Sequence, residues 1–440
     1  MQKYVIIGTG PAGVAAAEAI RSQDSGAAIT LIGDEPWGYY SRPGLAYYLT
    51  GELPEKGLFP FSEGDFQKLN LTTRYTRIRQ INPDAHQIEN QKGQKLQYDR
   101  LLIATGARAA RIEMPGINLE GVVVLDNLDD ARQIIKLSRK TRSAVVIGGG
   151  ITALEIVEGL VSRGVKTHYF LRGDRYWSNV LDETESRIVE SRLRHEGVQI
   201  HYHTELAEII EKRGRVAGVI TQNGEQIKCK TLAVAIGIQP RIELAVKAGL
   251  QTSRGILVNE YLQTNSPDIF AAGDVAQVYD PYSGKSVVDS LWGPARLQGH
   301  AAGLNMTGIA TPYSKAVPFN VTRLAGLTTT IIGTVGRGSD LDLMGIARGD
   351  SETWRQLPDA IAAQSDFDVN RLRIMVGTEH LIGAIVMGDQ TLSQPLYQLI
   401  LNRVNISPIC DNLLNPNVLL GDIISNFWAQ WSSQNAQSTK

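Results

Sequence analysis

The sequence predicts an α/β protein with two Rossmann-like dinucleotide-binding domains, because one strand–glycine–helix pattern occurs twice. The first copy reads YVIIGTGPAGVAAAEAI over residues 4–20, and the second reads AVVIGGGITALEIVEGL over residues 144–160. In each copy an apolar run typical of a buried strand precedes the glycines, and a largely apolar helix pattern follows them. A lone GxGxxG also occurs in ordinary turns, but two complete copies in this context predict two nucleotide-binding loops.

The first glycine loop joins the end of its strand to the start of its helix. Gly8 is placed to make the tight turn, Gly10 to let the backbone approach a pyrophosphate, and Gly13 to allow close helix–strand packing. Pro11 and Ala12 begin the helix, whose free N–H groups and dipole favour an anion. We therefore expect this loop to bind the phosphates of a dinucleotide.

Two acids, Asp34 and Glu35, follow the second strand of this first unit. They lie about twenty residues after the last glycine of the loop, where a carboxylate accepts hydrogen bonds from the adenosine ribose. The alternative is that both are solvated acids of a surface loop.

The second glycine loop has the same order of parts. Gly148, Gly149 and Gly150 make the turn, and Ile151 and Thr152 begin the helix, with alanine as the small residue at the third position. This loop predicts a second pyrophosphate-binding site.

The residues after the next strand bear on which nicotinamide coenzyme is bound. In VKTHYFLRGDR, Leu171 occupies the position where an acid favours NAD, and Arg172 and Arg175 follow it. Arginines accommodate a 2′-phosphate through charge-assisted hydrogen bonds of about 1.5–3 kcal/mol each. This pattern favours NADPH over NADH, whereas the alternative is a solvated basic turn.

Three later strand patterns also end in glycine-containing loops, as expected for nested nucleotide-binding sheets. An aspartate at such a strand end can accept a hydrogen bond from a sugar-like hydroxyl, and its alternative role is a helix N-cap. The candidate residues are Ala104, Thr105, Gly106 and Arg108 in YDRLLIATGARAA, Gly237 in LAVAIGIQP, and Gly273 and Asp274 in SPDIFAAGDVA.

Length, composition and charge limit the class of protein. A chain of 440 residues with 43% hydrophobic and 20% charged residues is long enough for several globular domains. The net charge of −1 predicts neither nucleic-acid binding nor attraction to anionic membranes. The opening MQKYVIIGTG lacks a signal-peptide pattern, and no apolar run approaches the roughly 18 residues of a spanning helix. We therefore expect a cytoplasmic protein.

The two cysteines, Cys229 and Cys410, are far apart in the sequence and form no CxxC pattern. This spacing predicts no redox-active disulfide between near neighbours and no zinc site of the usual kind. We expect no bound metal.

With these motifs together, the chain resembles the two-dinucleotide-binding-domain flavoproteins, the FAD-dependent pyridine nucleotide reductases. The resemblance covers roughly residues 1–310 and implies FAD in the first unit, NAD(P)H in the second, and hydride transfer from nicotinamide to flavin. The motifs that carry it are GTGPAG at 8–13, ATGAR at 104–108, GGGITALE at 148–155, AIGIQP at 235–240 and FAAGDVA at 270–276.

The same resemblance implies the domain limits. A discontinuous FAD-binding domain takes residues 1–112 and 244–312, and an NAD(P)H-binding domain takes residues 113–243 between them. A C-terminal α+β interface domain with an extra tail takes residues 313–440. The resemblance also puts Ile78 among the residues that contact the cofactor.

Within this family the chain is most similar to rubredoxin and ferredoxin reductases and to the flavin portion of NAD(P)H nitrite reductase. SRPGLAYYL at residues 41–49 resembles their stretch with an Arg-Pro pair, which implies that Arg42 and Pro43 lie against the flavin. The segment that begins at Leu291 resembles the one that brings a tryptophan, here Trp292, near the isoalloxazine ring.

The sequence departs from the pattern of those reductases at two positions. They usually carry a lysine where this chain has Tyr47, and that lysine pairs with a glutamate found here as Glu155. Without the lysine, either the pKa of Glu155 rises or another group compensates. Leu171 replaces the acid of NADH-dependent relatives, which puts NADH in doubt.

Three residues are expected to take part in catalysis, each with a structural alternative. Glu155 would hold the coenzyme's carboxamide or a flavin-side partner, unless it is a solvent-facing helix residue. Arg42 would stabilise the reduced, anionic flavin, unless it is a surface arginine at a turn. Trp292 would shield the flavin or relay electrons, unless it only anchors packing.

The main functional hypothesis is an FAD-dependent NAD(P)H oxidoreductase that passes electrons to a separate acceptor, such as a rubredoxin or a ferredoxin. The alternatives are an NAD(P)H oxidase or quinone reductase, and a redox-silent flavin-binding module. We also expect a homo-oligomer. The tail GDIISNFWAQW places an apolar stripe on one helix face, which we expect to pack on the parent fold or on a second subunit.

Overall fold

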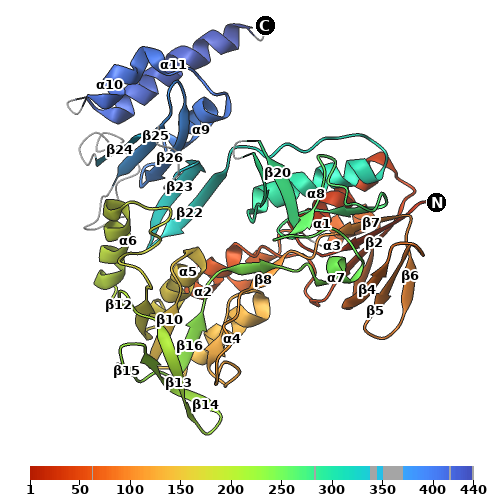
Figure 1. Ribbon diagram of the computed structural model, residues 1–440, viewed down its shortest axis with the longest axis horizontal. Coiled ribbons are helices and arrows are strands. Elements are labelled where there is room, and N and C mark those ends of the chain that lie inside the picture. The colour runs from red at the N-terminus through yellow and green to blue at the C-terminus, as the bar shows by residue number, and fades with distance from the viewer. Residues whose placement is uncertain (62, 282–283, 337–343, 350–369, 416–417, 439–440) are drawn as a thin grey trace. The chain divides into compact units, whose positions relative to one another are not determined.

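The computed structural model describes residues 1–61, 63–281, 284–336, 344–349, 370–415 and 418–438, which form two compact units (Figure 1). Each unit is assembled from segments that are separated in the sequence. Unit 1 comprises Met1–Ile117, Gly121–Thr141 and Val234–Lys315, and unit 2 comprises Asn118–Glu120, Arg142–Ala233 and Ala316–Lys440. The chain thus leaves unit 1 and returns to it.

Unit 1 is built on a five-stranded parallel sheet in the order β19-β7-β1-β2-β3. The strand order reverses at β1, and ligands of such sheets bind beside the carboxyl ends of the strands at this point. The bounds are β1 (Lys3–Ile7), β2 (Ala28–Gly33), β3 (Thr72–Tyr75), β7 (Arg100–Ile103) and β19 (Ile269–Ala271). Both the sheet and its order agree with the Rossmann-like fold that the sequence predicts.

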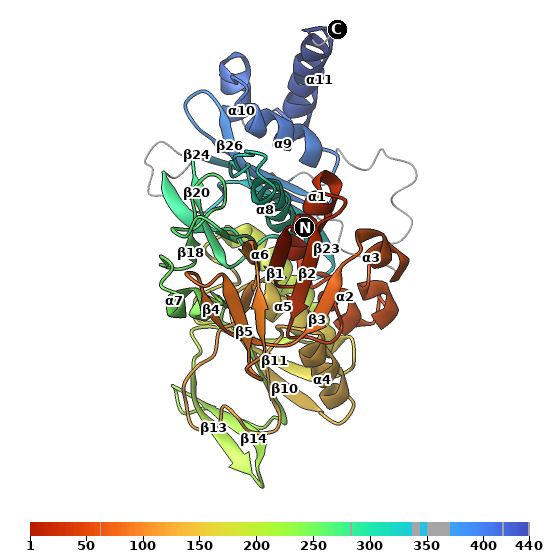
Figure 2. The ribbon, with the colours of Figure 1, turned by 90° about the vertical axis from the view of Figure 1, so that its right-hand side faces the viewer.

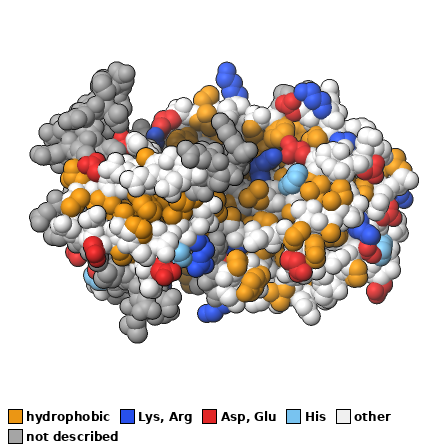
Figure 3. Space-filling model, turned by 90° about the horizontal axis from the view of Figure 1, so that it is seen from above, with side chains coloured by type: hydrophobic (Ala, Val, Ile, Leu, Met, Phe, Trp, Pro, Cys, Tyr) orange, Lys and Arg blue, Asp and Glu red, His pale blue; other side chains and the backbone are white. Residues whose placement is uncertain are grey.

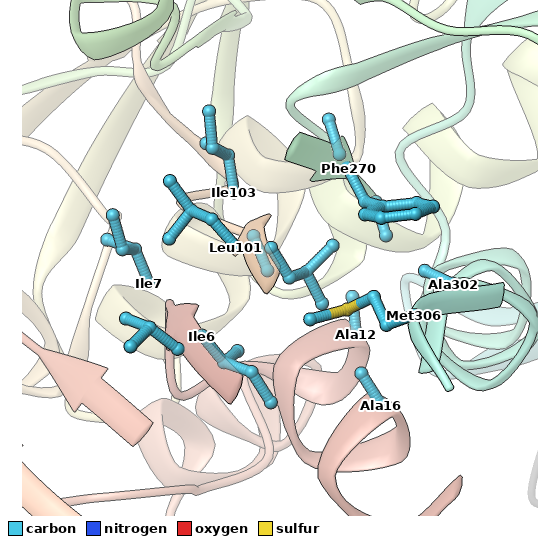
Figure 4. Packing of buried hydrophobic residues seen from close by; sticks show 14 of the residues in the cluster. Ile6, Ile7, Ala12, Ala16, Leu101, Ile103, Phe270, Ala302 and Met306 are labelled. Atoms are coloured by element: carbon cyan, nitrogen blue, oxygen red, sulfur yellow. The ribbon is translucent and has the colours of Figure 1, made fainter. Parts of the chain in front are cut away.

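Helices α1 (Pro11–Gln23) and α8 (Trp292–Met306) pack closely against each other in unit 1. A Cβ on Gly299 would lie 2.1 Å from the carbonyl oxygen of Ala12, and one on Gly303 would lie 2.6 Å from that of Ala16. Figure 4 shows Ala12 and Ala16 facing α8 within the buried core. Glycine on one helix and alanine on the other let the two backbones approach, which fixes the start of α1.

The rest of unit 1 surrounds this sheet with small sheets and short helices. The small sheets have the orders β4-β5-β6, β17-β8 and β18-β20-β21. Their bounds are β4 (Ile78–Asn82), β5 (Gln87–Asn90), β6 (Lys95–Gln97), β8 (Ala107–Ala109), β17 (Ile238–Pro240), β18 (Ile256–Leu257), β20 (Ala276–Asp280) and β21 (Lys285–Val288). The other elements are α2 (Gly44–Thr50), η1 (Glu55–Leu58), α3 (Glu63–Leu69), β9 (Val122–Val123), α4 (Leu128–Ser138) and α7 (Glu243–Lys247).

The nucleotide-binding part of unit 2 repeats the parallel arrangement, with strands in the order β12, β11, β10 and β16. Helix α5 follows β10 directly, as the second glycine motif predicts. The bounds are β10 (Ser143–Ile147), α5 (Ile151–Val161), β11 (Lys166–Phe170), α6 (Glu183–His195), β12 (Gln199–His201) and β16 (Thr231–Val234). An antiparallel sheet of β13 (Leu206–Lys212), β14 (Arg215–Thr221) and β15 (Gln226–Ile227) lies between β12 and β16 in the sequence.

The C-terminal part of unit 2 is a five-stranded antiparallel sheet in the order β22-β23-β26-β25-β24, with helices on it (Figure 2). This arrangement confirms the predicted α+β character. The bounds are β22 (Phe319–Leu324), β23 (Leu327–Gly333), β24 (Met344–Gly349), β25 (Arg371–Val376), β26 (Leu381–Met387), α9 (Ser393–Leu401), η3 (Ser407–Ile409), α10 (Cys410–Leu414) and α11 (Leu420–Ser438).

The predicted apolar stripe of the tail lies on helix α11. Ile423 and Ile424 are buried, and Phe427, Trp428 and Trp431 pack against the same core, which α9 and the sheet also form. The stripe therefore packs on the parent fold.

The described helices include none that is both long and apolar enough to cross a membrane. On the face drawn in Figure 3, the Lys and Arg side chains are scattered among Asp and Glu rather than gathered in one patch.

Candidate functional site

The loop between β1 and α1 has two tight positions and one open position. Gly8 has a φ of +132°, and a Cβ there would lie 1.9 Å from the carbonyl oxygen of Ala104. A Cβ on Gly13 would lie 2.0 Å from the carbonyl oxygen of Gly8, whereas one on Gly10 would meet nothing within 4 Å. The tight glycines bring helix and strands together, and the backbone at Gly10 has room for a ligand.

The start of α1 suits the pyrophosphate of FAD. Pro11 occupies the first turn, and the N–H groups of Ala12 and Gly13 lie too near the helix start to have acceptors within the helix. The first turn carries no acidic residue, so the positive end of the helix dipole is not neutralised there. The residues present therefore fit a bound dinucleotide at this position.

The two acids predicted to bind the ribose have different surroundings. The Asp34 carboxylate is exposed and lies 3.6 Å from the guanidinium of Arg241. The Glu35 carboxylate accepts a hydrogen bond of 2.6 Å from the Tyr40 hydroxyl and is paired with Arg42. Glu35 thus already has two partners within the protein, whereas Asp34 is the more accessible acid.

Arg42 is held in place by groups from two segments. Its guanidinium pairs with Glu35 and donates to the carbonyl oxygen of Asp126. Tyr40, two residues earlier in the loop, accepts a hydrogen bond of 3.0 Å from the backbone N–H of Leu128 at the start of α4. Pro43 follows as the residue before α2. Arg42 is therefore anchored at a defined position, with its side chain 41% exposed.

The Gly273–Asp274 turn lies between β19 and β20. Gly273 has a φ of +78°, donates its N–H to the Gln298 side chain at 2.8 Å, and would place a Cβ 3.1 Å from that of Ala12. Asp274 precedes a strand, so the helix N-cap alternative is wrong for this residue. Burial raises the pKa of Asp274 to about 6, and the positive charge of Arg42 opposes this rise. Asp274 and Arg42 therefore belong to the same set of groups in unit 1.

Trp292 is the first residue of α8 and has both an anchored edge and an exposed face. Its indole N–H donates to the Tyr39 hydroxyl at 3.2 Å, and the Arg296 guanidinium lies 5.5 Å from the centre of its ring. The side chain is nevertheless 47% exposed. These contacts fix the ring without burying it.

The remaining predicted residues of unit 1 mostly shape the backbone. Gly106 and Gly237 have positive φ angles of +66° and +118°, and strands β8 and β17 pair beside them. Arg108 forms an ion pair of 2.6 Å with Glu243. The backbone N–H of Ala104 donates to the carbonyl oxygen of Ile7, and the Thr105 hydroxyl donates to the carbonyl oxygen of Arg241. Ile78 is buried in the core.

Arg241 was not recognised from the sequence. Its guanidinium donates to Asp126 at 2.9 Å and to the carbonyl oxygen of Ala107 at 3.1 Å, and it also lies near Asp34. It thus connects several segments around the predicted cofactor site. Its place directly after the AIGIQP motif is the signal that could have identified it.

The second glycine loop, in unit 2, has the same open character. Gly148 has a φ of +141°, and a Cβ on Gly149 or Gly150 would meet nothing within 4 Å. Helix α5 begins at Ile151 and Thr152 and has no acidic residue in its first turn. This loop fits a second dinucleotide.

The three residues used to predict the coenzyme point in different directions. Leu171 is buried, so its side chain belongs to the core. Arg175 is only 11% exposed and pairs with Asp174 at 3.0 Å, whereas Arg172 is exposed. Of the two arginines, Arg172 is therefore the one available to a ligand.

Glu155 lies on the second turn of α5 and is largely buried. Burial raises the pKa of its carboxyl group to about 7. Within the described residues this carboxyl group has no hydrogen-bond or ion-pair partner. Glu155 is therefore not a solvent-facing helix residue. Without a pairing lysine, either a raised pKa or a compensating group is expected, and the structure favours the raised pKa.

Comparison with known proteins agrees with this geometry. The model of the pyridine nucleotide-disulphide oxidoreductase family matches residues 2–297. The chain belongs to this family. It is therefore an FAD-dependent oxidoreductase that uses a nicotinamide coenzyme, with the predicted α/β fold.

Three similar relatives are themselves named as reductases. The chain is 33% identical to rhodocoxin reductase of Rhodococcus erythropolis over 76% of this chain and 80% of the relative. It is 30% identical to rubredoxin-NAD(+) reductase of Ectopseudomonas oleovorans over 64% and 74%. It is 29% identical to the 3-phenylpropionate/cinnamic acid dioxygenase ferredoxin–NAD(+) reductase component of Photorhabdus laumondii over 92% and 98%.

Among solved structures, the chain resembles putidaredoxin reductase in its covalent complex with putidaredoxin. The two share 25% identity and a TM-score of 0.83, with 97% of this chain and 98% of the other covered. The likeness extends over the C-terminal part as well as the two nucleotide-binding parts.

Proposed function

We propose that this protein oxidises NADPH or NADH and passes the electrons through FAD to a separate small redox protein, such as a rubredoxin or a ferredoxin. The observation that carries the proposal is the loop of residues 34–43. This loop holds a fixed Arg42 next to the candidate FAD site and contains no cysteine. Both cysteines of the chain are free, and burial raises the pKa of the Cys229 thiol to about 12, which keeps it unreactive. The names of the relatives point to the same kind of acceptor.

The residues of unit 1 would bind and orient FAD. The N-terminus of α1 and the backbone at Gly10 would hold the pyrophosphate, and Asp34 would accept from the adenosine ribose. Asp274, at a strand end of the same unit, would accept from a sugar-like hydroxyl. The bound flavin supplies the hydride-accepting chemistry, and Arg42 would place a positive charge where the reduced form carries a negative one.

The residues of unit 2 would bind the nicotinamide coenzyme. The N-terminus of α5 would hold its pyrophosphate, and Glu155, which is neutral below its raised pKa, would donate a hydrogen bond to the coenzyme's carboxamide. Exposed Arg172 favours NADPH, whereas the relatives are named as NAD(+) reductases. Measuring kcat/KM with each coenzyme decides between NADPH and NADH. A kcat/KM for NADPH that is lower than that for NADH rejects the NADPH preference.

The experiment that tests the function is anaerobic reduction of the FAD-loaded protein in a stopped-flow instrument. NADPH or NADH should bleach the flavin absorbance, and subsequent mixing with oxidised rubredoxin or ferredoxin should restore it quickly. Absent bleaching with both coenzymes would reject the proposal. Reoxidation that is as fast with air or a quinone as with every carrier protein would favour the oxidase or quinone reductase instead.

Three further properties belong to the proposal. The FAD-binding segments are residues 1–112 and 244–312, the NAD(P)H-binding segment is 113–243, and the C-terminal domain is 313–440. The protein acts as a homo-oligomer, which light scattering on the purified chain would test, since a monomeric mass rejects it. It acts in the cytoplasm, in line with a reaction that uses soluble coenzymes.

A further inference from the structure

The hairpin turn between β22 and β23 has an unusual tip. Its two central residues, Ala325 and Gly326, both have positive φ angles, of +48° and +76°. Leu324 and Leu327 pair across the hairpin on either side of them. Two positive φ angles match the twist of a two-residue hairpin, but alanine adopts this conformation only at an energetic cost. Ala325 is only 1% exposed, so this tip is buried rather than solvated.

The tip is buried against two helices of the nucleotide-binding part of unit 2, and Figure 1 shows this end of the hairpin beside α5 and α6. The Nε of Arg192 on α6 donates to the carbonyl oxygen of Ala325 at 2.6 Å. The backbone N–H of Gly326 donates to Oε1 of Glu158 on α5 at 3.1 Å. One backbone carbonyl and one backbone N–H at the tip of the turn therefore attach the C-terminal part to the nucleotide-binding helices.

Glu158 lies three residues after Glu155, which puts the two carboxyl groups on one face of α5. Burial raises the pKa of both groups to about 7. The N–H of Gly326 and the charge of Arg323 favour the ionised form of Glu158, and Glu155 has no such support. The charged groups whose fields act on Glu158 are Arg323, Glu196 and Glu155.

We propose that Glu158 is a positioning residue for the nicotinamide coenzyme, because its bond to Gly326 fastens α5 to the C-terminal turn. This inference rests on the proposed function. A helix of eleven residues moves as a unit, so a shift at Glu158 also moves Glu155 and the glycine loop at the helix start. A displacement of about 1 Å in such positioning groups can cost up to about a hundredfold in rate.

Three variants test the inference in the FAD-loaded protein by anaerobic flavin reduction over a range of coenzyme concentrations. Glu158→Ala removes the acceptor, Glu158→Gln keeps an acceptor oxygen without the charge, and Glu208→Ala removes an exposed glutamate of β13 as a matched control. We expect Glu158→Ala to lower the limiting rate of flavin reduction at least fivefold, or to raise the half-saturating concentration of the coenzyme at least fivefold. Glu158→Gln and Glu208→Ala should stay within twofold of the wild type. Wild-type behaviour of Glu158→Ala, or failure of Glu158→Gln to rescue it, would overturn the proposal.

A measurement on the unmodified protein keeps the inference testable if Glu158→Ala does not fold. Hydrogen–deuterium exchange of a peptide covering residues 320–330 is compared without coenzyme and with saturating NADP⁺ or NAD⁺. Slower exchange of the turn amides with coenzyme supports the link, and unchanged exchange with both coenzymes overturns it. This readout needs no electron transfer, so it separates failure of the inference from failure of the proposed function.

Discussion

Replacing Glu155 with glutamine tests how far burial perturbs this carboxyl group, through its effect on stability at different pH. Burial raises the pKa from 4.5 to about 7, a difference of about 2.5 pH units. At 1.36 kcal/mol per unit, the ionised carboxylate costs the folded protein at most about 3.4 kcal/mol. Partial contact with solvent lowers this to about 1–3 kcal/mol.

The direction follows from proton binding by the folded and unfolded protein. Between pH 4.5 and about 7 the folded protein keeps a proton on Glu155 that the unfolded chain has lost, so the contribution of Glu155 to stability falls as the pH rises. Above about pH 7 the full cost remains. Glutamine cannot ionise, so Glu155→Gln should match the wild type near pH 4.5 and exceed its stability by about 1–3 kcal/mol at pH 8.

Urea unfolding of the FAD-loaded protein at four pH values between 4.5 and 8 measures this difference. The concentration of added FAD must be kept constant, because a ligand that binds only the folded state adds to stability. Glu208→Gln, at an exposed position of β13, should show no pH-dependent difference. A gain for Glu155→Gln that is the same at every pH, or a loss at pH 8, would refute the reasoning.

Three other outcomes follow from the site and its surroundings. Gly8→Ala should prevent folding and FAD binding, because its Cβ would lie 1.9 Å from the carbonyl oxygen of Ala104. Gly10→Ala should fold but bind FAD at least tenfold more weakly. Flavin absorbance after gel filtration measures the FAD content of both variants, and an FAD content equal to that of the wild type would contradict these expectations. Arg172→Glu should raise KM for NADPH at least tenfold and KM for NADH less than threefold, and equal changes in steady-state assays would argue against a 2′-phosphate contact. Burial and a neighbouring imidazole lower the pKa of His168 to about 4, so only the unfolded chain gains this proton between pH 6.5 and 4, and the contribution of His168 to stability falls as the pH is lowered. His168→Gln removes this contribution, so its stability relative to the wild type should rise over that pH range in thermal melts, and a difference that does not depend on pH would contradict this.

The orientation of side chains around the second unit's strand end could not be derived from the sequence. Their spacing predicts that Leu171, Arg172 and Arg175 together determine which nicotinamide coenzyme is bound. In the structure, Leu171 is core, Arg175 is turned toward Asp174, and Arg172 is exposed. Consecutive residues after a strand point in different directions, and which of them faces a ligand depends on the loop that packs against them.

Both glycine loops, the parallel strands before them and the apolar stripe of the tail could be predicted from the sequence, because they depend on local periodicity and on where a backbone tolerates only glycine. Which groups meet across long sequence separations is visible only in the folded chain. Arg42 pairs with Glu35 and with the carbonyl of Asp126, and Gly326 donates to Glu158. The same holds for the raised pKa of Glu155, because the cost of ionisation depends on how completely the folded chain removes water from the carboxyl group.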